Sequence, residues 1–369
     1  MGKYFIRRLL GLIPLFIAVV VISFFLMQFA PGGPEQAMKE SKKLTNAQIE
    51  RWLNAWCLEG EDSIVATAKE FGGWAGILNC NNDGWNAFFS EQGGLNFLPR
   101  TLGGGDNGIL HGDFGRSIAN GREVLGIITE RLPATLLLAG AALFVWVSLA
   151  LVIGVIAAVR QYGKFDQAST FLAYIFYSLP TFWLGLMLIF FFAVYLHWLP
   201  TSGMVNAREW PPFGTPDFGV AVGKDPLGAI KEIGTHMVLP LITLVAVNIA
   251  GDSRFVRASM LDVLNQDYVR TAKAKGAAPR RVYGRHALRN ALLPVVTNVG
   301  LELPFLVAGA IVTETIFVWP GMGSLFIQSL RESDYFVLMA VIMITSAMIL
   351  FANLIADLVY GIVDPRIRY

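Results

Sequence analysis

The run ATLLLAGAALFVWVSLALVIGVIAAV, residues 134–159, decides the class of this chain. It has no charged side chain, and as a helix it is long enough to cross a bilayer core of about 30 Å. The whole chain of 369 residues is 54% hydrophobic and 15% charged, and its formal net charge is +2. These values indicate an integral membrane protein rather than a set of soluble domains, and they give no sign of nucleic acid as a partner.

Five further apolar segments complete a prediction of six transmembrane helices. The spans are expected at residues 9–30, 134–159, 171–196, 237–250 with an extension towards 255, 291–312 and 335–359. The fourth is the weakest, because it is short and contains Pro240 and Asn248. The first is longer than the apolar part of a signal peptide, so we interpret it as a retained span. Each span must be helical to satisfy its backbone in lipid, which predicts an all-α membrane protein.

Basic residues predict the orientation of these spans. Lysines and arginines of the short loops gather on the side that carries both termini, so both termini are expected to be cytoplasmic. The predicted parts are a first span with a cytoplasmic N-terminus (1–30), an enlarged external loop domain (31–133), a core of five spans (134–359) and a cytoplasmic tail (360–369). The core includes a cytoplasmic loop at 252–290.

The two cysteines of the chain, Cys57 and Cys80, both fall in the external loop domain. On the oxidising side of a membrane two such residues can form a disulfide. Two buried free thiols are the alternative, and the sequence leaves both open.

Motifs of catalysis are absent from the sequence. It has no GxxxxGK[ST] phosphate loop, GxSxG, HExxH or CxxC, and its four histidines are scattered, so we expect a conduit without its own ATP or metal site. Glu302, inside the fifth span, is expected either to line the translocation path or to pair with a neighbouring helix or subunit. Asp357, near the cytoplasmic end of the last span, is expected either to pair with arginines of the loops or to take a direct part in transport.

The stretch DYVRTAKAKGAAPRRVYGRHALRN, residues 267–290, holds seven Lys or Arg residues. Asn265 is predicted to cap a short helix at 266–275, Gly276 to end it, and Pro279 to begin a second helix. Small residues gather at the joint. Three interpretations compete: a solvated positive loop, a surface for lipid headgroups, and a docking element for a partner protein.

This stretch, extended to Leu293-Pro294, resembles the cytoplasmic loop signature of ABC importer permeases, and most closely the peptide/nickel branch with its dipeptide and oligopeptide permease B-type subunits. In the general signature Glu-Ala-Ala is followed by three residues and then Gly. Here Arg270-Thr271-Ala272 and Gly276 occupy those positions. The missing Glu and the later Leu-Pro depart from the general form but are shared by this branch. The segments YFIRRLLGLIPLF near the start, ETIFVWPGMG at 314–323 and the terminal DPRIRY are also similar.

The resemblance implies a type I ABC importer permease fold in the cell inner membrane. The implied partners are a second permease chain, two cytoplasmic ATPase subunits that bind ATP and Mg²⁺, an external binding protein and membrane lipid. Peptide import is the implied function, with nickel chelates or oligosaccharides as alternatives in the same branch. A stand-alone secondary transporter and a membrane scaffold are the interpretations outside it.

In such a permease the stretch at 267–290 would contain the coupling helix that contacts an ATPase subunit. Ala272, Ala274 and Gly276 are then expected to pack closely at that contact. The polar residues expected around it are Arg270, Thr271, Lys273 and Arg280.

Overall fold

The computed structural model describes residues 2–28, 71 and 114–363, and these are mostly helical. Within those ranges there is no strand, only an isolated antiparallel bridge between Arg116 and Glu123. The chain divides into two compact units. The core unit is Met1–Leu12, Leu132–Ser324 and Ala347–Tyr369, and the second unit is Ile13–Arg131 and Leu325–Ser346.

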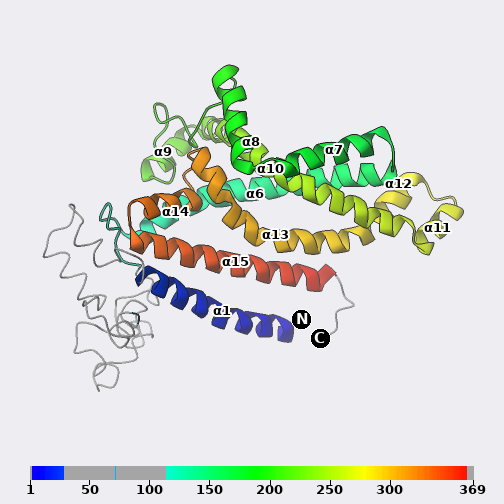
Figure 1. The fold of residues 1–369 in the computed structure, drawn as a ribbon, viewed down its shortest axis with the longest axis horizontal. Coiled ribbons are helices and arrows are strands. Elements are labelled where there is room, and N and C mark those ends of the chain that lie inside the picture. The colour runs from blue at the N-terminus through cyan, green and yellow to red at the C-terminus, as the bar shows by residue number, and fades with distance from the viewer. Residues whose placement is uncertain (1, 29–70, 72–113, 364–369) are drawn as a thin grey trace. The chain divides into compact units, whose positions relative to one another are not determined.

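Figure 1 labels the helices in chain order. They are α1 (Gly2–Gln28), α6 (Val124–Val159), α7 (Lys164–Ser178), α8 (Thr181–Leu188), the π-helix η3 (Ile189–Tyr195), α9 (Pro216–Lys224), α10 (Pro226–Leu264), α11 (Asp267–Ala274), α12 (Pro279–Arg281), the π-helix η4 (Val282–Leu288), α13 (Arg289–Ile316), α14 (Met322–Arg331) and α15 (Tyr335–Val363).

Three of the described helices are long and apolar enough to cross a membrane: α6, α10 and the part of α15 at Tyr335–Leu358. A fourth crossing results if α7 and α8–η3, which are bent by 101° relative to each other, form one broken span. The helices α1 and α13 lie where the first and fifth spans are predicted. The count of six spans stays a prediction.

The third predicted span is not the single helix expected at 171–196. It begins earlier, at Lys164, and breaks at Leu179 and Pro180, whose ψ angles are 130° and 132°. Proline has no amide hydrogen to donate and disfavours the helical conformation in the residue before it, which accounts for the break.

The fourth predicted span, which seemed the weakest, belongs to the longest helix described. α10 has 39 residues and continues through Pro240. Asp225 caps its start, because the carboxylate accepts a hydrogen bond of 2.9 Å from the Gly228 amide, and Pro226 occupies the first turn. Hydropathy alone detected only the apolar middle of this helix.

α10 is the central helix of the core unit and packs against α7, α8 and α13 (Figure 1). Its contact with α6 is close, because a Cβ placed on Gly154 of α6 would lie 2.6 Å from the Cβ of Val256. The buried side chains of Trp146 and Ala150 pack with Val245 along the same pair of helices. The helix that leads into α11 is therefore held on several sides.

Candidate functional site

The predicted coupling stretch forms the short helix α11 and the α12–η4 helix, with a turn between them. Val269 of α11 is fully buried, and the Asn290 side-chain amide donates a 2.8 Å hydrogen bond to the Tyr268 hydroxyl. These contacts hold one face of α11 against η4 and the start of α13. The opposite face, with Arg270, Thr271 and Lys273, is exposed.

Gly276 ends α11 as predicted, with a φ of +74°. The Ala277 amide donates to the Ala272 carbonyl at 3.2 Å, and the Gly276 amide donates to the Lys273 carbonyl at 3.0 Å. This pair of hydrogen bonds is the Schellman motif, in which the residue after the helix adopts the left-handed conformation that glycine favours. No atom lies within 4 Å of a Cβ placed on Gly276, so backbone conformation rather than crowding requires glycine there.

The start of each short helix tests two further predictions. Pro279 does occupy the first turn of α12. Asn265 was predicted as the N-cap of α11, and that was wrong: Gln266 has that position, while Asn265 ends α10 and donates to the Leu261 carbonyl at 3.1 Å. The cause is the unexpected length of α10, which leaves Asn265 at its last turn.

The residues expected at the docking surface come together on one small element. Ala274, Gly276 and Arg280 are exposed, as are the polar residues of α11, whereas Ala272 is half-buried against the turn. The one ion pair within the stretch joins Arg270 and Asp267 at 3.8 Å, and both side chains are exposed, so it stabilises little. The surface therefore presents net positive charge and small side chains.

Other predicted residues are less well described. Glu302 lies within α13, but its side chain is outside the described residues, as are Cys57 and Cys80 entirely. Asp357 is half-buried in α15 and has an interaction partner. Within residues 2–28, 71 and 114–363, no group of three or more His, Cys, Asp or Glu is placed to hold a metal ion.

Asp252 is a buried acid that sequence analysis missed. It is 4% exposed, and its carboxylate accepts hydrogen bonds from the Trp146 indole at 2.6 Å and from the Asn298 amide at 2.9 Å. These bonds connect α10 to α6 and α13. The prediction placed residue 252 at the start of a cytoplasmic loop, so its burial was not considered.

The contacts of Glu314 account for several residues of the ETIFVWPGMG segment. Its fully buried carboxylate accepts hydrogen bonds from the Thr135 hydroxyl at 2.7 Å and from the amides of Gly323 and Ser324 at 2.7 and 3.1 Å, at the start of α14. A negative charge stabilises a helix N-terminus, where amides lack helical partners. A side chain on Gly321 would collide with this carboxylate, which accounts for a glycine there.

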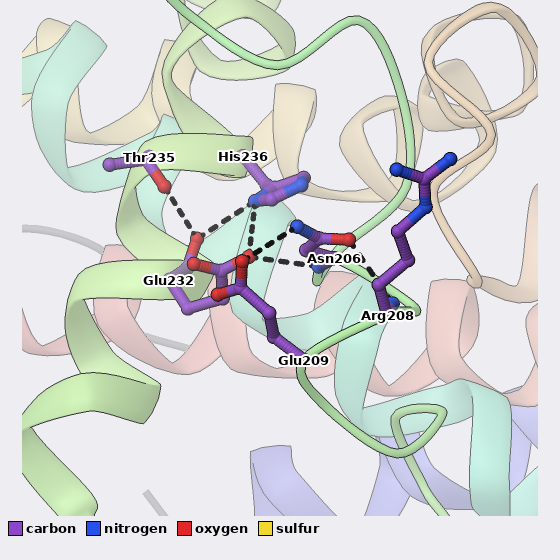
Figure 2. A network of polar contacts seen from close by, with 6 residues as sticks. All are labelled: Asn206, Arg208, Glu209, Glu232, Thr235 and His236. Carbon is purple, nitrogen blue, oxygen red and sulfur yellow. Dashed lines mark hydrogen bonds and ion pairs between the residues drawn. The ribbon is translucent and has the colours of Figure 1, made fainter.

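A second polar network fastens the loop before α9 to the first part of α10 (Figure 2). The Glu232 carboxylate accepts a 2.8 Å hydrogen bond from the Asn206 amide and lies 3.5 Å from His236 Nδ1. The Asn206 side chain in turn accepts from the Arg208 amide and donates to Glu209. The network orders a loop for which the distribution of basic residues predicts a position outside the cell.

Apolar helices of spanning length define a helical membrane protein, and the stretch at 267–290 gives it an exposed basic surface. Its fold is similar to a solved structure of the MetNI methionine ABC transporter in an inward-facing conformation, with a TM-score of 0.50 and 17% identity over 65% of this chain and 97% of that chain. At that identity the likeness is one of fold alone.

Sequence comparison identifies the family. Residues 150–369 match the model of the binding-protein-dependent transport system inner membrane component. Over the full length, the chain is 36% identical to the oligopeptide transport system permease protein AppB of Bacillus subtilis, all of which is covered. It is 34% identical to the dipeptide transport system permease protein DppB of Escherichia coli K12, of which 99% is covered. The chain belongs to this family of permease components.

Proposed function

We propose that this chain is the translocation-pathway subunit of a binding-protein-dependent ABC importer that moves peptides into the cell. The observation that carries the proposal is the end-to-end similarity to permeases named for oligopeptides and dipeptides. The same machinery acting on nickel chelates or oligosaccharides is the second candidate. A secondary transporter working alone is disfavoured, because an exposed basic helix and turn would then have no partner.

The proposed assembly contains a second permease chain, two cytoplasmic ATPase subunits and an external binding protein, in the inner membrane and in contact with its lipid. The ATPase subunits, not this chain, would bind ATP and Mg²⁺ and carry out hydrolysis. The chain would cross the membrane six times with both termini in the cytoplasm. The division into a first span, an external loop domain at 31–133, a five-span core and a tail belongs to the same proposal.

The coupling contact is proposed at α11 and the following turn. Arg270, Thr271, Lys273 and Arg280 would face acidic or polar groups of an ATPase subunit, while Ala272, Ala274 and Gly276 let its backbone come close. Because α11 follows directly on α10, a push on α11 would reach the packed core of helices. Glu302 is proposed to line the path, and Cys57 and Cys80 are proposed to form a disulfide.

Reconstitution of the complete importer in proteoliposomes tests the proposal. Uptake of a labelled peptide should require ATP, the binding protein and both ATPase subunits. The ATPase subunits should co-purify with the intact chain and be lost when residues 267–290 are deleted. Peptide uptake without ATPase subunits would overturn the proposal, and uptake of nickel chelates or oligosaccharides in place of peptides would select the second candidate.

A further inference from the structure

Arg254 is a cation within a membrane helix, held between two tyrosine rings. Its guanidinium carbon lies 4.8 Å from the centre of the Tyr174 ring and 5.2 Å from that of Tyr177, both on α7. Its Nε donates a 3.0 Å hydrogen bond to the Ala250 carbonyl. The rings and this hydrogen bond fix the guanidinium in one orientation.

The neighbouring Arg257 shows what is unusual about this site. One turn further along α10, the Arg257 guanidinium binds Asp166 through two nitrogens, at 2.5 and 2.8 Å. Among the residues that the structure describes, no carboxylate pairs with Arg254, and its two terminal nitrogens have no acceptor. Those nitrogens form the planar pair of donors that binds a carboxylate through two hydrogen bonds.

The site is separated along α7 from the basic loop that precedes this helix. Tyr174 and Tyr177 lie ten and thirteen residues after the start of α7 at Lys164, which is about 15 and 20 Å along a helix. Lys164 belongs to a short basic loop at the membrane face, and the bilayer core is about 30 Å thick. The two rings therefore lie well along α7 from Lys164, within the segment where the third span is predicted.

The backbone beside the site indicates that it does not face lipid chains. The break between α7 and α8 begins at Leu179, two residues after Tyr177. Irregular backbone at membrane depth occurs where it is covered by protein or lines a water-filled cavity, and charged side chains follow the same rule. Tyr174 and Tyr177 are 55% and 63% exposed in the single chain, so the two rings can be reached from outside this chain.

We infer that Arg254, oriented by Tyr174 and Tyr177, binds the C-terminal carboxylate of a peptide as it passes through the membrane. The inference rests on the proposed function, since it requires peptides as substrates. It makes Arg254 a residue that discriminates among substrates within the permease, separately from the binding protein. A peptide amide would lack the anion that the guanidinium requires.

The test compares the uptake of Ala-Ala and Ala-Ala-Ala-Ala, each as free acid and as C-terminal amide, in the reconstituted importer. We expect Arg254→Gln to lower the ratio of acid to amide uptake about tenfold, because a bond between two charged groups is lost. The binding protein is the same in the wild-type and the Arg254→Gln preparations. Its own preference for acid over amide therefore cancels when the acid-to-amide ratio of one preparation is divided by that of the other. Arg208→Gln, which removes an exposed positive charge elsewhere, should leave the ratio unchanged.

Each other outcome has a defined meaning. An unchanged ratio in Arg254→Gln overturns the inference, whereas absence of peptide uptake in the wild type overturns the proposed function instead. Equal slowing of acid and amide, with loss of a co-purified anionic phospholipid, would make Arg254 a headgroup site and also overturn the inference. If Arg254→Gln does not fold, Tyr174→Leu combined with Tyr177→Leu keeps the charge but frees the guanidinium, and the ratio should fall severalfold. An unchanged ratio of acid to amide uptake in that double variant would also overturn the inference.

Discussion

At the scale of single residues, Glu314 shows how a buried charge is made tolerable. The Thr135 hydroxyl and the amides of Gly323 and Ser324 donate to its carboxylate, and both amides are at the start of α14. We expect Glu314→Ala to lower the free energy of unfolding by about 3 kcal/mol, because these buried donors lose their acceptor. The apparent unfolding temperature in detergent measures this effect. Glu123→Ala, at an exposed position, should change stability by less than about 0.5 kcal/mol, and equal loss in both variants would contradict the prediction.

Substitutions at Gly276 can separate two requirements at this position, the left-handed backbone conformation and free space around the residue. At a φ of +74°, a β-branched residue is strained, whereas asparagine tolerates the left-handed region. We expect Gly276→Val to raise the number of ATP molecules hydrolysed per peptide imported several times over, and Gly276→Asn to do so much less. The measurement is the ratio of the two rates in proteoliposomes. Normal coupling in Gly276→Val would refute the assignment of this turn to the ATPase contact.

The turn that interrupts the stretch at 267–290 could be predicted from sequence, because helix breakers act locally. Gly276 and Pro279 punctuate the stretch as expected, since each has a conformational preference that the rest of the fold does not alter. Asp252 and Arg254 could not be predicted in the same way. Their roles depend on side chains from other helices, Trp146 and Tyr174 among them, and no local pattern records such contacts.

At the scale of helices, α6 and α10 approach each other closely at Gly154. A Cβ there would lie 2.7 Å from the Ser253 carbonyl oxygen as well as against Val256, so the helices would have to separate. We expect Gly154→Ala to destabilise the protein by about 1–3 kcal/mol in spite of alanine's better helix propensity. The unfolding temperature in detergent checks this.

Gly140 on the same helix provides the matched control. No atom lies within 4 Å of a Cβ placed there, so Gly140→Ala should be neutral or should stabilise by up to about 1 kcal/mol. Opposite signs for the two substitutions are the expected result. If both lower stability equally, the close approach of α6 and α10 is not what Gly154 provides.

Hydropathy locates helices of this kind but not their limits. The run at 134–159 lies within α6, which begins ten residues earlier at Val124, and the weak segment around Pro240 belongs to a helix of 39 residues. Polar residues continue a helix beyond the apolar core, so a scale of apolarity cannot detect these extensions. A proline alone does not predict a break, because the chain breaks at Pro180 whereas α10 continues through Pro240. Which of the two occurs depends on the groups that surround each proline.

At the scale of the whole molecule, the proposed function depends on orientation. The ATPase contact at 267–290 must lie in the cytoplasm, and the loop that carries the Glu232 network must lie outside. Both follow from the same distribution of lysine and arginine, so the two placements succeed or fail together.

Reporter fusions in cells test that orientation. Alkaline phosphatase needs disulfides and is active only outside the cytoplasm, so it should be active when inserted after Arg208 and inactive when fused after Tyr369 or inserted after Gly163. A fluorescent protein that folds in the cytoplasm should give the opposite pattern at the same three positions. Gly163 lies in the short turn between α6 and α7, which makes it an internal control for the C-terminal fusion. Phosphatase activity after both Gly163 and Tyr369 would reverse the orientation, and with it the assignment of α11 to a cytoplasmic ATPase.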